Sequence, residues 1–201
     1  MELILASFYS WNAGTTMQKS HVGLMRSLLR QCLLQQPGLT LRVCKRRAAC
    51  LQMLGPEALN ELPDWEWDEL RGCLGAFAAD VRSDHRLALF IDGLDEFSED
   101  HGKLVELIKE LGSFGGVKIC VSSRPWNIFN DAFNCNPSVA VQDLTRRDID
   151  IYIKAHFNPL PAFRDIRRLN PGQVTALLKE IASKASGVFL MGCRRRTASH
   201  R

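Results

Sequence analysis

Five consecutive apolar residues, Leu87–Ile91 (LALFI), place the strongest constraint on how this chain folds. Short runs that are apolar throughout are typical of parallel strands, which are buried on both faces of a sheet. Residues 3–11 (LILASFYSW) and 117–123 (VKICVSS) have the same character, and residues 138–144 (SVAVQDL) indicate a further strand. The sequence therefore predicts a mostly parallel sheet that is covered by helices on both faces.

Amphipathic segments separate these strands, as such a sheet requires. Residues 20–36 carry apolar side chains at three- and four-residue spacings and are stopped by Pro37 and Gly38, which predicts a helix with definite ends. The same spacing predicts helices over residues 65–81, 102–111 and 171–186, and residues 41–54 favour another. In residues 144–157, Thr145 and Asp148 have the spacing of a capping box, which predicts a helix that starts at Thr145.

The predicted fold class is therefore α/β, a parallel sheet followed by a C-terminal helical portion. We divide the chain into a sheet-containing core over residues 1–143 and the start of a helical subdomain over residues 144–190. Residues 191–201 include the run RRR and form a basic tail that we expect to be disordered.

Charge is distributed unevenly along the chain. The net charge of +4 combines +6 over residues 1–56, −10 over residues 57–115 and +8 over residues 116–201. A nucleic-acid-binding protein more often has a continuous basic stripe with interleaved aromatic residues, so nucleic acid is not a favoured partner. The first residues, MELILASFYSW, carry Glu2 where a secretory signal has Lys or Arg, so we expect neither a signal peptide nor a membrane span.

The seven cysteines occur singly, without a C-x-x-C pair. An odd number of isolated cysteines argues for reduced thiols in the cytoplasm, and against a zinc site or a disulfide framework.

Three carboxylates, Asp92, Asp95 and Glu96, follow the apolar strand directly in the sequence IDGLDEF. Ligands of open parallel sheets bind beyond the carboxyl ends of the strands, so Asp92 is expected at the edge where sites form. A carboxylate there can hold Mg²⁺, commonly through water, while Asp95 or Glu96 can polarise an attacking water. The next strand leads to Arg124, whose guanidinium can bind a terminal phosphate through two hydrogen bonds.

These segments carry a resemblance to a known family. LALFIDGLDEF followed by VKICVSSRPW resembles the Walker B and sensor 1 strands of a NACHT-type P-loop NTPase. Residues 7–33 (SFYSWNAGTTMQKSHVGLMRSLLRQCL) are similar to the second strand and helix of fungal NOD-like receptors of the nephrocystin-like group, and LTRRDIDIYI and ASGVFL resemble later helical segments of that group. The matching segments occur in the family's order along nearly the whole chain.

The resemblance implies a role for each site residue. Asp92 matches the magnesium-associated Walker B acid, Asp95 and Glu96 match the acids among which the catalytic base is sought, and Arg124 matches the sensor arginine. Family membership implies ATP and Mg²⁺ as cofactors, and other NACHT proteins or further copies of the chain as partners. The implied role is nucleotide-controlled oligomerisation, which serves non-self recognition and regulated cell death in fungi.

The sequence departs from the family in one important respect. It contains no G-x-x-x-x-G-K-[ST], the loop that cradles phosphates, and the family places this loop before the strand with which the present chain begins. We therefore expect a truncated or mis-spliced NACHT module without a central strand of the sheet. Such a chain by itself should bind no nucleotide, hydrolyse none and tend to aggregate.

Two other functions remain open at this point. A regulatory fragment could use the remaining helices to bind a full-length NACHT relative. A metal-dependent hydrolase could instead be built on Asp92, Asp95 and Glu96, although no His, Cys or distant carboxylate cluster supports them. The acids can also form a solvated turn, and Arg124 can cap the strand end or pair with them.

Overall fold

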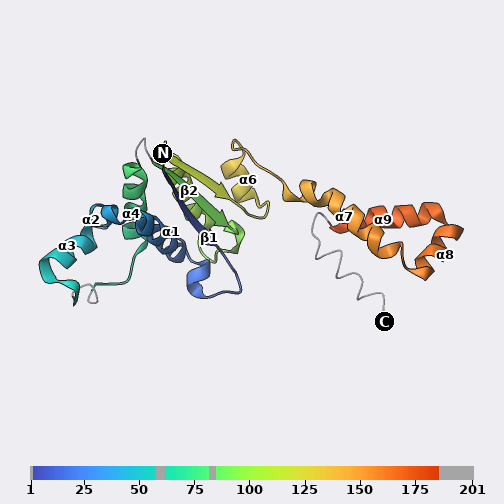
Figure 1. The fold of residues 1–201 in the computed structure, drawn as a ribbon, viewed down its shortest axis with the longest axis horizontal. Coiled ribbons are helices and arrows are strands. Elements are labelled where there is room, and N and C mark those ends of the chain that lie inside the picture. Colours follow the sequence, from blue (N-terminus) through green and yellow to red (C-terminus); the bar gives the residue numbers. More distant parts are fainter. Residues whose placement is uncertain (1, 58–61, 82–84, 186–201) are drawn as a thin grey trace. The chain divides into compact units, whose positions relative to one another are not determined.

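The computed structural model describes residues 2–57, 62–81 and 85–185, and the predicted tail over residues 191–201 lies outside them. The chain divides into a first compact unit, Met1–Cys135, and a second, Asn136–Arg201 (Figure 1). The predicted boundary after residue 143 falls within a helix of the second unit, Val141–Phe157.

A three-stranded parallel sheet forms the centre of the first unit (Figure 1). Its strands are β1 (Glu2–Tyr9), β2 (His85–Asp92) and β3 (Val117–Val121), in the order β1-β2-β3. Tyr9 is paired with Asp92 and Ile91 with Val121, so the carboxyl ends of all three strands lie at the same end of the sheet. This arrangement confirms the α/β fold class, and the strands that lead to Asp92 and Arg124 are parallel neighbours.

Helices connect the strands. Between β1 and β2 lie α1 (His21–Gln35), α2 (Thr40–Val43), α3 (Lys45–Leu54) and α4 (Trp67–Asp80), with single 3-10 turns at η1 (Thr16–Lys19) and η2 (Pro37–Leu39). After β2 follow η4 (Leu94–Glu96) and α5 (His101–Gly112), and after β3 follows α6 (Asn127–Phe133). The predicted helices over residues 20–36, 65–81 and 102–111 are confirmed, and residues 41–54 form two helices that break at Cys44.

Within the first unit, helices cover only one face of the sheet, and the prediction of two covered faces does not hold there. Alternate strand residues, among them Ile4, Ala6 and Leu89, join buried residues of α1, α4 and α5 in one core. The side chains of the opposite face are exposed, and Leu3 and Leu5 are 59% and 46% accessible. The apolar run LALFI hid this alternation because Phe90, on the open face, is as apolar as its buried neighbours.

The outer edge of β1 is closed by two glutamines of α1. The Gln31 side chain accepts a hydrogen bond from the Ser7 amide (3.0 Å) and donates one to the Ser7 carbonyl (2.8 Å). One turn later, Gln35 makes the same pair of bonds with the amide (3.0 Å) and the carbonyl (2.7 Å) of Leu5. The two side-chain amides thus satisfy backbone groups that a neighbouring strand would otherwise pair.

The outer edge of β3 has no such closure among the described residues. Ser122 donates its amide to Ile91 and accepts from Gly93, so the even-numbered residues of this segment face β2. Since alternate residues of a parallel ladder face alternate neighbours, the backbone groups of Ile119 and Val121 point away from the sheet.

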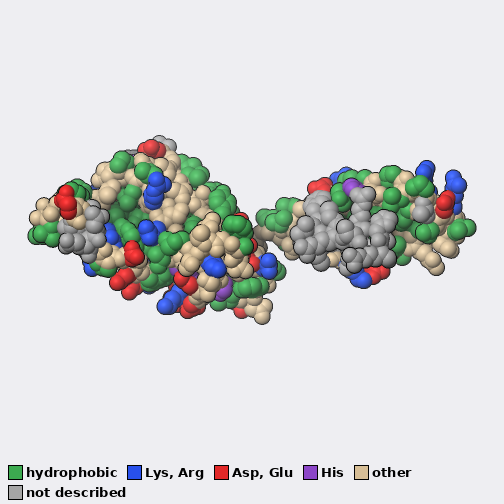
Figure 2. All heavy atoms as spheres, turned by 90° about the horizontal axis from the view of Figure 1, so that it is seen from below, with side chains coloured by type: hydrophobic (Ala, Val, Ile, Leu, Met, Phe, Trp, Pro, Cys, Tyr) green, Lys and Arg blue, Asp and Glu red, His purple; other side chains and the backbone are tan. Residues whose placement is uncertain are grey.

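The second unit is helical. It contains α7 (Val141–Phe157), α8 (Pro161–Leu169) and α9 (Pro171–Ala185), of which α9 confirms the last predicted helix. Its small core consists of Ile149 and Ile153 with partly buried side chains from the end of α7 and from α9. Hydrophobic side chains also reach the surface of each unit (Figure 2).

Two predictions for the start of this unit are wrong. The segment SVAVQDL is not a strand, because α7 already begins at Val141 and both Val139 and Val141 are exposed. Thr145 therefore lies inside the helix, where its hydroxyl donates to the carbonyl of Val141 (3.1 Å), and it does not form a capping box. An alternation of apolar residues indicates a strand only where a sheet edge can receive it.

In the part of the chain that the structure describes, no helix combines the length and the apolar character that crossing a membrane requires.

Candidate functional site: the carboxyl-end rim

A sharp turn at Gly93 brings the acidic segment against the ends of the strands. Gly93 has φ +78° and ψ 50°, a left-handed conformation that glycine adopts without steric cost. The carbonyl of Ser122 accepts hydrogen bonds from the amides of Gly93 (3.1 Å) and Leu94 (2.9 Å), and Leu94 is fully buried beneath the turn. We call this turn, together with Asp92, Asp95, Glu96, Ser122 and Arg124, the carboxyl-end rim.

Asp92 lies at the carboxyl end of β2, as the sequence predicted, and is exposed. Its carboxylate accepts a hydrogen bond from the hydroxyl of Ser122, the residue that follows β3. Its backbone carbonyl accepts from the amide of Ser10 (3.0 Å), the residue that follows β1. Asp92 is therefore held in place by both neighbouring strands while its carboxylate stays open to solvent.

Asp95 and Arg124 form the charged pair of the rim. The Asp95 carboxylate accepts from the Arg124 amide (2.9 Å) and lies 3.2 Å from Nε of the same residue. The Asp95 side chain is only 6% exposed, whereas that of Arg124 is 72% exposed. Both Asp95 oxygens are thus engaged by Arg124, and the guanidinium Nη atoms have no protein partner within the described residues.

Glu96 is directed to a different segment, the loop after β1. One of its carboxylate oxygens accepts from the Asn12 amide (2.9 Å). The three acids therefore have three separate partners and do not converge on one point. Within the described residues, no group of three or more His, Cys, Asp and Glu side chains is arranged to hold a metal ion.

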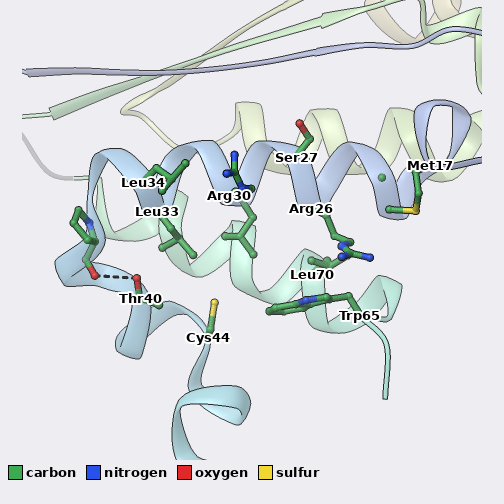
Figure 3. A pocket seen from close by; sticks show the side chains of 13 residues that line it. Met17, Arg26, Ser27, Arg30, Leu33, Leu34, Thr40, Cys44, Trp65 and Leu70 are labelled. Carbon is green, nitrogen blue, oxygen red and sulfur yellow. Dashed lines mark hydrogen bonds between the residues drawn. The ribbon is translucent and has the colours of Figure 1, made fainter. Parts of the chain in front are cut away.

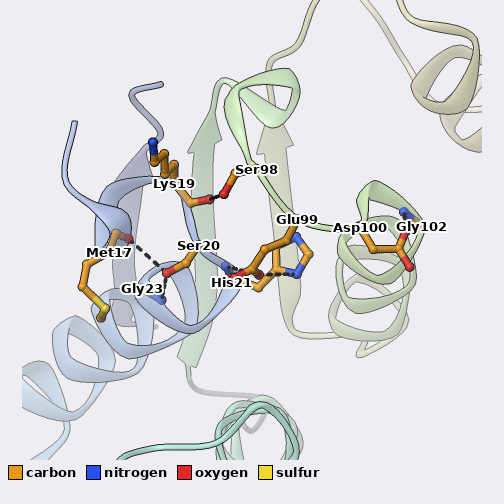
Figure 4. Close-up of polar contacts among 9 residues, drawn as sticks. All are labelled: Met17, Lys19, Ser20, His21, Gly23, Ser98, Glu99, Asp100 and Gly102. Carbon is orange, nitrogen blue, oxygen red and sulfur yellow. Dashed lines mark hydrogen bonds and ion pairs between the residues drawn. The ribbon is translucent and has the colours of Figure 1, made fainter. Parts of the chain in front are cut away.

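The chain that follows the rim is tied to the start of α1 (Figure 4). The carboxylate of Glu99 accepts from the backbone amide of His21 (2.9 Å) and lies 3.0 Å from the imidazole Nδ1 of His21. The amide of Ser98 donates to the carbonyl of Lys19 (3.1 Å). These contacts fix the position of α1 relative to the acidic turn.

His21 is buried at this junction, and its Nε2 has no hydrogen-bond partner. Burial lowers the pKa of His21 below its ordinary value, although the Glu99 carboxylate opposes part of this shift. The lowered pKa favours the neutral imidazole, whose Nδ1 is placed to donate to Glu99.

The structure brings together Asp92, Asp95, Glu96 and Arg124 at the carboxyl ends of the strands, although each acid has its own partner. The sequence reasoning missed Ser122, which positions Asp92 and receives the amides of the turn. Its signal was present, because Ser122 lies at the end of the strand predicted over residues 117–123 and the ends of neighbouring parallel strands meet.

Taken together, the rim and its sheet define the class: an α/β protein with a polar site at the carboxyl ends of parallel strands. A family model described as "Nephrocystin 3, N-terminal" matches residues 2–124, which include the whole sheet and end at Arg124. The chain belongs to this nephrocystin 3 N-terminal family. Neither the curated proteins nor the solved structures include a significant match.

The donor atoms of the rim fit the cofactors implied by the NACHT resemblance only in part. Asp92 is exposed and retains carboxylate lone pairs for a magnesium-bound water, which is how Mg²⁺ commonly meets a protein carboxylate. Asp95 does not fit a metal because Arg124 occupies both of its oxygens. The sequence holds no glycine-rich phosphate loop with its lysine, so the rim supplies at most one side of a nucleotide site.

Proposed function

We propose that this chain is part of a NACHT-type, nucleotide-controlled signalling module of the kind found in fungal NOD-like receptors. In this proposal, ATP with Mg²⁺ controls oligomerisation with other NACHT proteins or further copies, in non-self recognition and cell-death signalling. The observation that carries the proposal is the placement of Asp92, Glu96 and Arg124 on one rim, with two neighbouring strands holding Asp92. Membership of the nephrocystin 3 N-terminal family supports the nephrocystin-like part of this proposal.

The roles of the rim residues follow from their contacts. Asp92 is placed to hold Mg²⁺ through water, and Ser122 orients its carboxylate. Glu96 is the better placed of the two remaining acids to orient a water, because Asn12 engages only one of its oxygens. Asp95 holds Arg124, whose free Nη groups are available to a phosphate.

A complementation experiment tests this proposal. The chain is co-expressed with a strand–loop–helix segment that carries G-x-x-x-x-G-K-[ST], taken from a NACHT protein, and Mg-ATP binding is measured by calorimetry. We expect no saturable binding to the chain alone, and binding to the complemented chain that weakens about tenfold or more in Asp92→Asn and in Arg124→Ala.

Asp131→Asn is the matched control, because Asp131 is an exposed acid of α6 outside the rim. Binding to the complemented chain that is equally strong in Asp92→Asn and Asp131→Asn would contradict the rim assignment. Micromolar ATP binding to the chain alone that depends on Asp92 would instead show that the phosphate loop is dispensable.

The open sheet favours a second candidate function, a regulatory fragment that binds a full-length NACHT relative. Leu3, Leu5 and Phe90 are exposed on the uncovered face, and the outer edge of β3 offers free backbone groups. A relative would dock by adding an extended segment along β3. Co-purification with an intact NACHT protein, lost when Cys120 on the exposed face is replaced by Lys, distinguishes this function from the nucleotide module.

A further inference from the structure

A cavity of about 820 Å³ lies between α1, the start of α2 and the segment that precedes α4 (Figure 3). None of the rim residues lines it. Its walls are mostly apolar and include Leu33, Leu70 and Trp65. This volume lies within the range of roughly 300 to 1,000 Å³ that is usual for small-molecule sites, which combine apolar walls with a few polar groups.

Two arginines of α1, Arg26 and Arg30, are the charged residues of the lining, and no Asp or Glu is among them. Both are exposed, and neither has a hydrogen-bond or ion-pair partner among the described residues. The sequence of α1, HVGLMRSLLRQCLLQ, contains no acid that could neutralise them. Like charges four residues apart on a helix repel each other, so this pair is uncompensated within the chain.

Other arginines of the first unit differ from this pair. Arg42 lies 2.6 Å from Asp80, Arg71 lies 2.6 Å from Glu110, and Arg47 makes two hydrogen bonds to Glu69. These arginines are thus paired with acids, whereas Arg26 and Arg30, which line the cavity, have no acceptor among the described residues. An anion supplied from outside is the partner that this distribution lacks.

Trp65 gives the cavity a fixed aromatic wall. The guanidinium of Arg47 lies 3.8 Å from the centre of the Trp65 ring, and Arg47 is held in turn by Glu69 and by the carbonyl of Pro63 (2.9 Å). Figure 3 shows the side chain of Arg26 extending from α1 toward Trp65. The apolar wall and one cationic group are thus adjacent before any ligand is bound.

We propose that this cavity binds a small organic anion with an apolar body, whose carboxylate or phosphate head is held by Arg26 and Arg30. The apolar body packs against Leu33, Leu70 and Trp65. Charge complementarity determines the head group, and the size and lining of the cavity determine the body. This site is independent of the carboxyl-end rim and of nucleotide.

Binding of decanoate and of decyl phosphate to the full chain, measured by titration calorimetry, tests the proposal and separates the two head groups. We expect saturable one-to-one binding of at least one of them, and binding of decanol, which has the same body without charge, at least about tenfold weaker. Arg26→Gln with Arg30→Gln should weaken binding of the anion by about tenfold or more and leave decanol unchanged.

Two further variants distinguish loss of the anion site from a general loss of positive charge or of folding. Arg146→Gln with Arg147→Gln removes the same charge from exposed positions of α7 and should leave binding unchanged. Arg26→Glu with Arg30→Glu should reject decanoate and accept decylammonium. Cys44 also lines the cavity, so the bound anion should slow its alkylation by iodoacetamide, as read by mass spectrometry.

The proposal is overturned if decanol binds as tightly as the anions, or if the Arg26 and Arg30 variants bind them like the Arg146 and Arg147 control. It is also overturned if neither anion binds saturably, since the cavity then accommodates only a protein segment or water.

Discussion

The two outer edges of the sheet, β1 and β3, differ in whether their outward backbone groups are hydrogen-bonded. At β1, Gln31 and Gln35 of α1 bond both backbone groups of Ser7 and Leu5, whereas at β3 the outward groups of Ile119 and Val121 meet no further strand within the described residues. A helix can thus close a sheet edge with side-chain amides. The comparison shows that the outward backbone groups of β1 are hydrogen-bonded, whereas those of β3 have no partner among the described residues.

Proline substitutions in β3 should give the largest effect and test which groups face outward. Cys120 directs its amide toward β2, so Cys120→Pro removes a ladder bond and leaves a buried carbonyl unpaired, at a cost of about 1 to 3 kcal/mol. Val121 directs its amide outward, so Val121→Pro should cost clearly less. Urea unfolding measures both, and equal costs would mean that the β3 edge is already paired.

Removing a glutamine should be the next largest effect. Gln31→Leu leaves the partly buried amide and carbonyl of Ser7 unpaired and should lower the free energy of unfolding by about 1 to 3 kcal/mol. Gln35→Leu should cost less, because water can reach the exposed groups of Leu5.

Gln36→Leu is the control for these variants, since among the described residues the Gln36 side chain hydrogen-bonds only to Glu2, on the surface. If all three substitutions have the same small effect, the glutamines do not close the edge in solution.

Hydrogen exchange should show the contrast between the edges more locally. The amide of Ser7 should exchange at least about tenfold more slowly than that of Val121, because only Ser7 has a protein acceptor on its outer side. In Gln31→Leu the difference should vanish. NMR-detected exchange on the unsubstituted chain and this variant decides the point, and faster exchange at Ser7 than at Val121 would reverse the comparison.

The smallest expected effect concerns pH and the helix that closes β1. Because burial lowers the pKa of His21 from its ordinary value of 6.5, the unfolded chain takes up a proton at a higher pH than the folded chain. The stability contributed by neutral His21 is therefore present above pH 6.5 and is lost as the pH falls toward the lower folded pKa. Among the charges near His21, those of Glu99 and Asp100 raise its pKa, and those of His101 and Lys103 lower it.

Urea unfolding between pH 7 and pH 5 checks this expectation. His21→Phe keeps the aromatic contacts with Trp67 and Phe97 and should flatten the pH dependence. His85→Gln, at a half-buried histidine, should not flatten it. A steeper loss of stability in His21→Phe than in the unsubstituted chain would show that the protonated imidazole stabilises the fold.

Periodicity predicted the three strands and most helices of the first unit because burial selects which residues can be apolar. It did not show that one sheet face is open, since Leu3, Leu5 and Phe90 are apolar although exposed. The short helices α6 and α8 were missed, because so few turns hold too little of a repeating pattern.

For the rim, the sequence predicted that Asp92 and Arg124 follow the carboxyl ends of two strands. The register of β2 and β3 places these two ends side by side. The sequence could not show that Asp95 pairs with Arg124 while Glu96 turns to Asn12, since these contacts depend on the path of the loops. Gln31 and Gln35 were equally hidden, because in sequence they are polar residues on an amphipathic helix.

The closed edge of β1 limits how many copies of this chain can associate through their sheets. A second copy that pairs its β3 with the β3 of the first creates a two-fold, self-complementary contact. Both outer boundaries of that pair are then β1 strands whose backbone groups Gln31 and Gln35 already occupy. If two copies paired in this way, growth by edge pairing would stop there, because Gln31 and Gln35 already bond the outward backbone groups of each β1 strand.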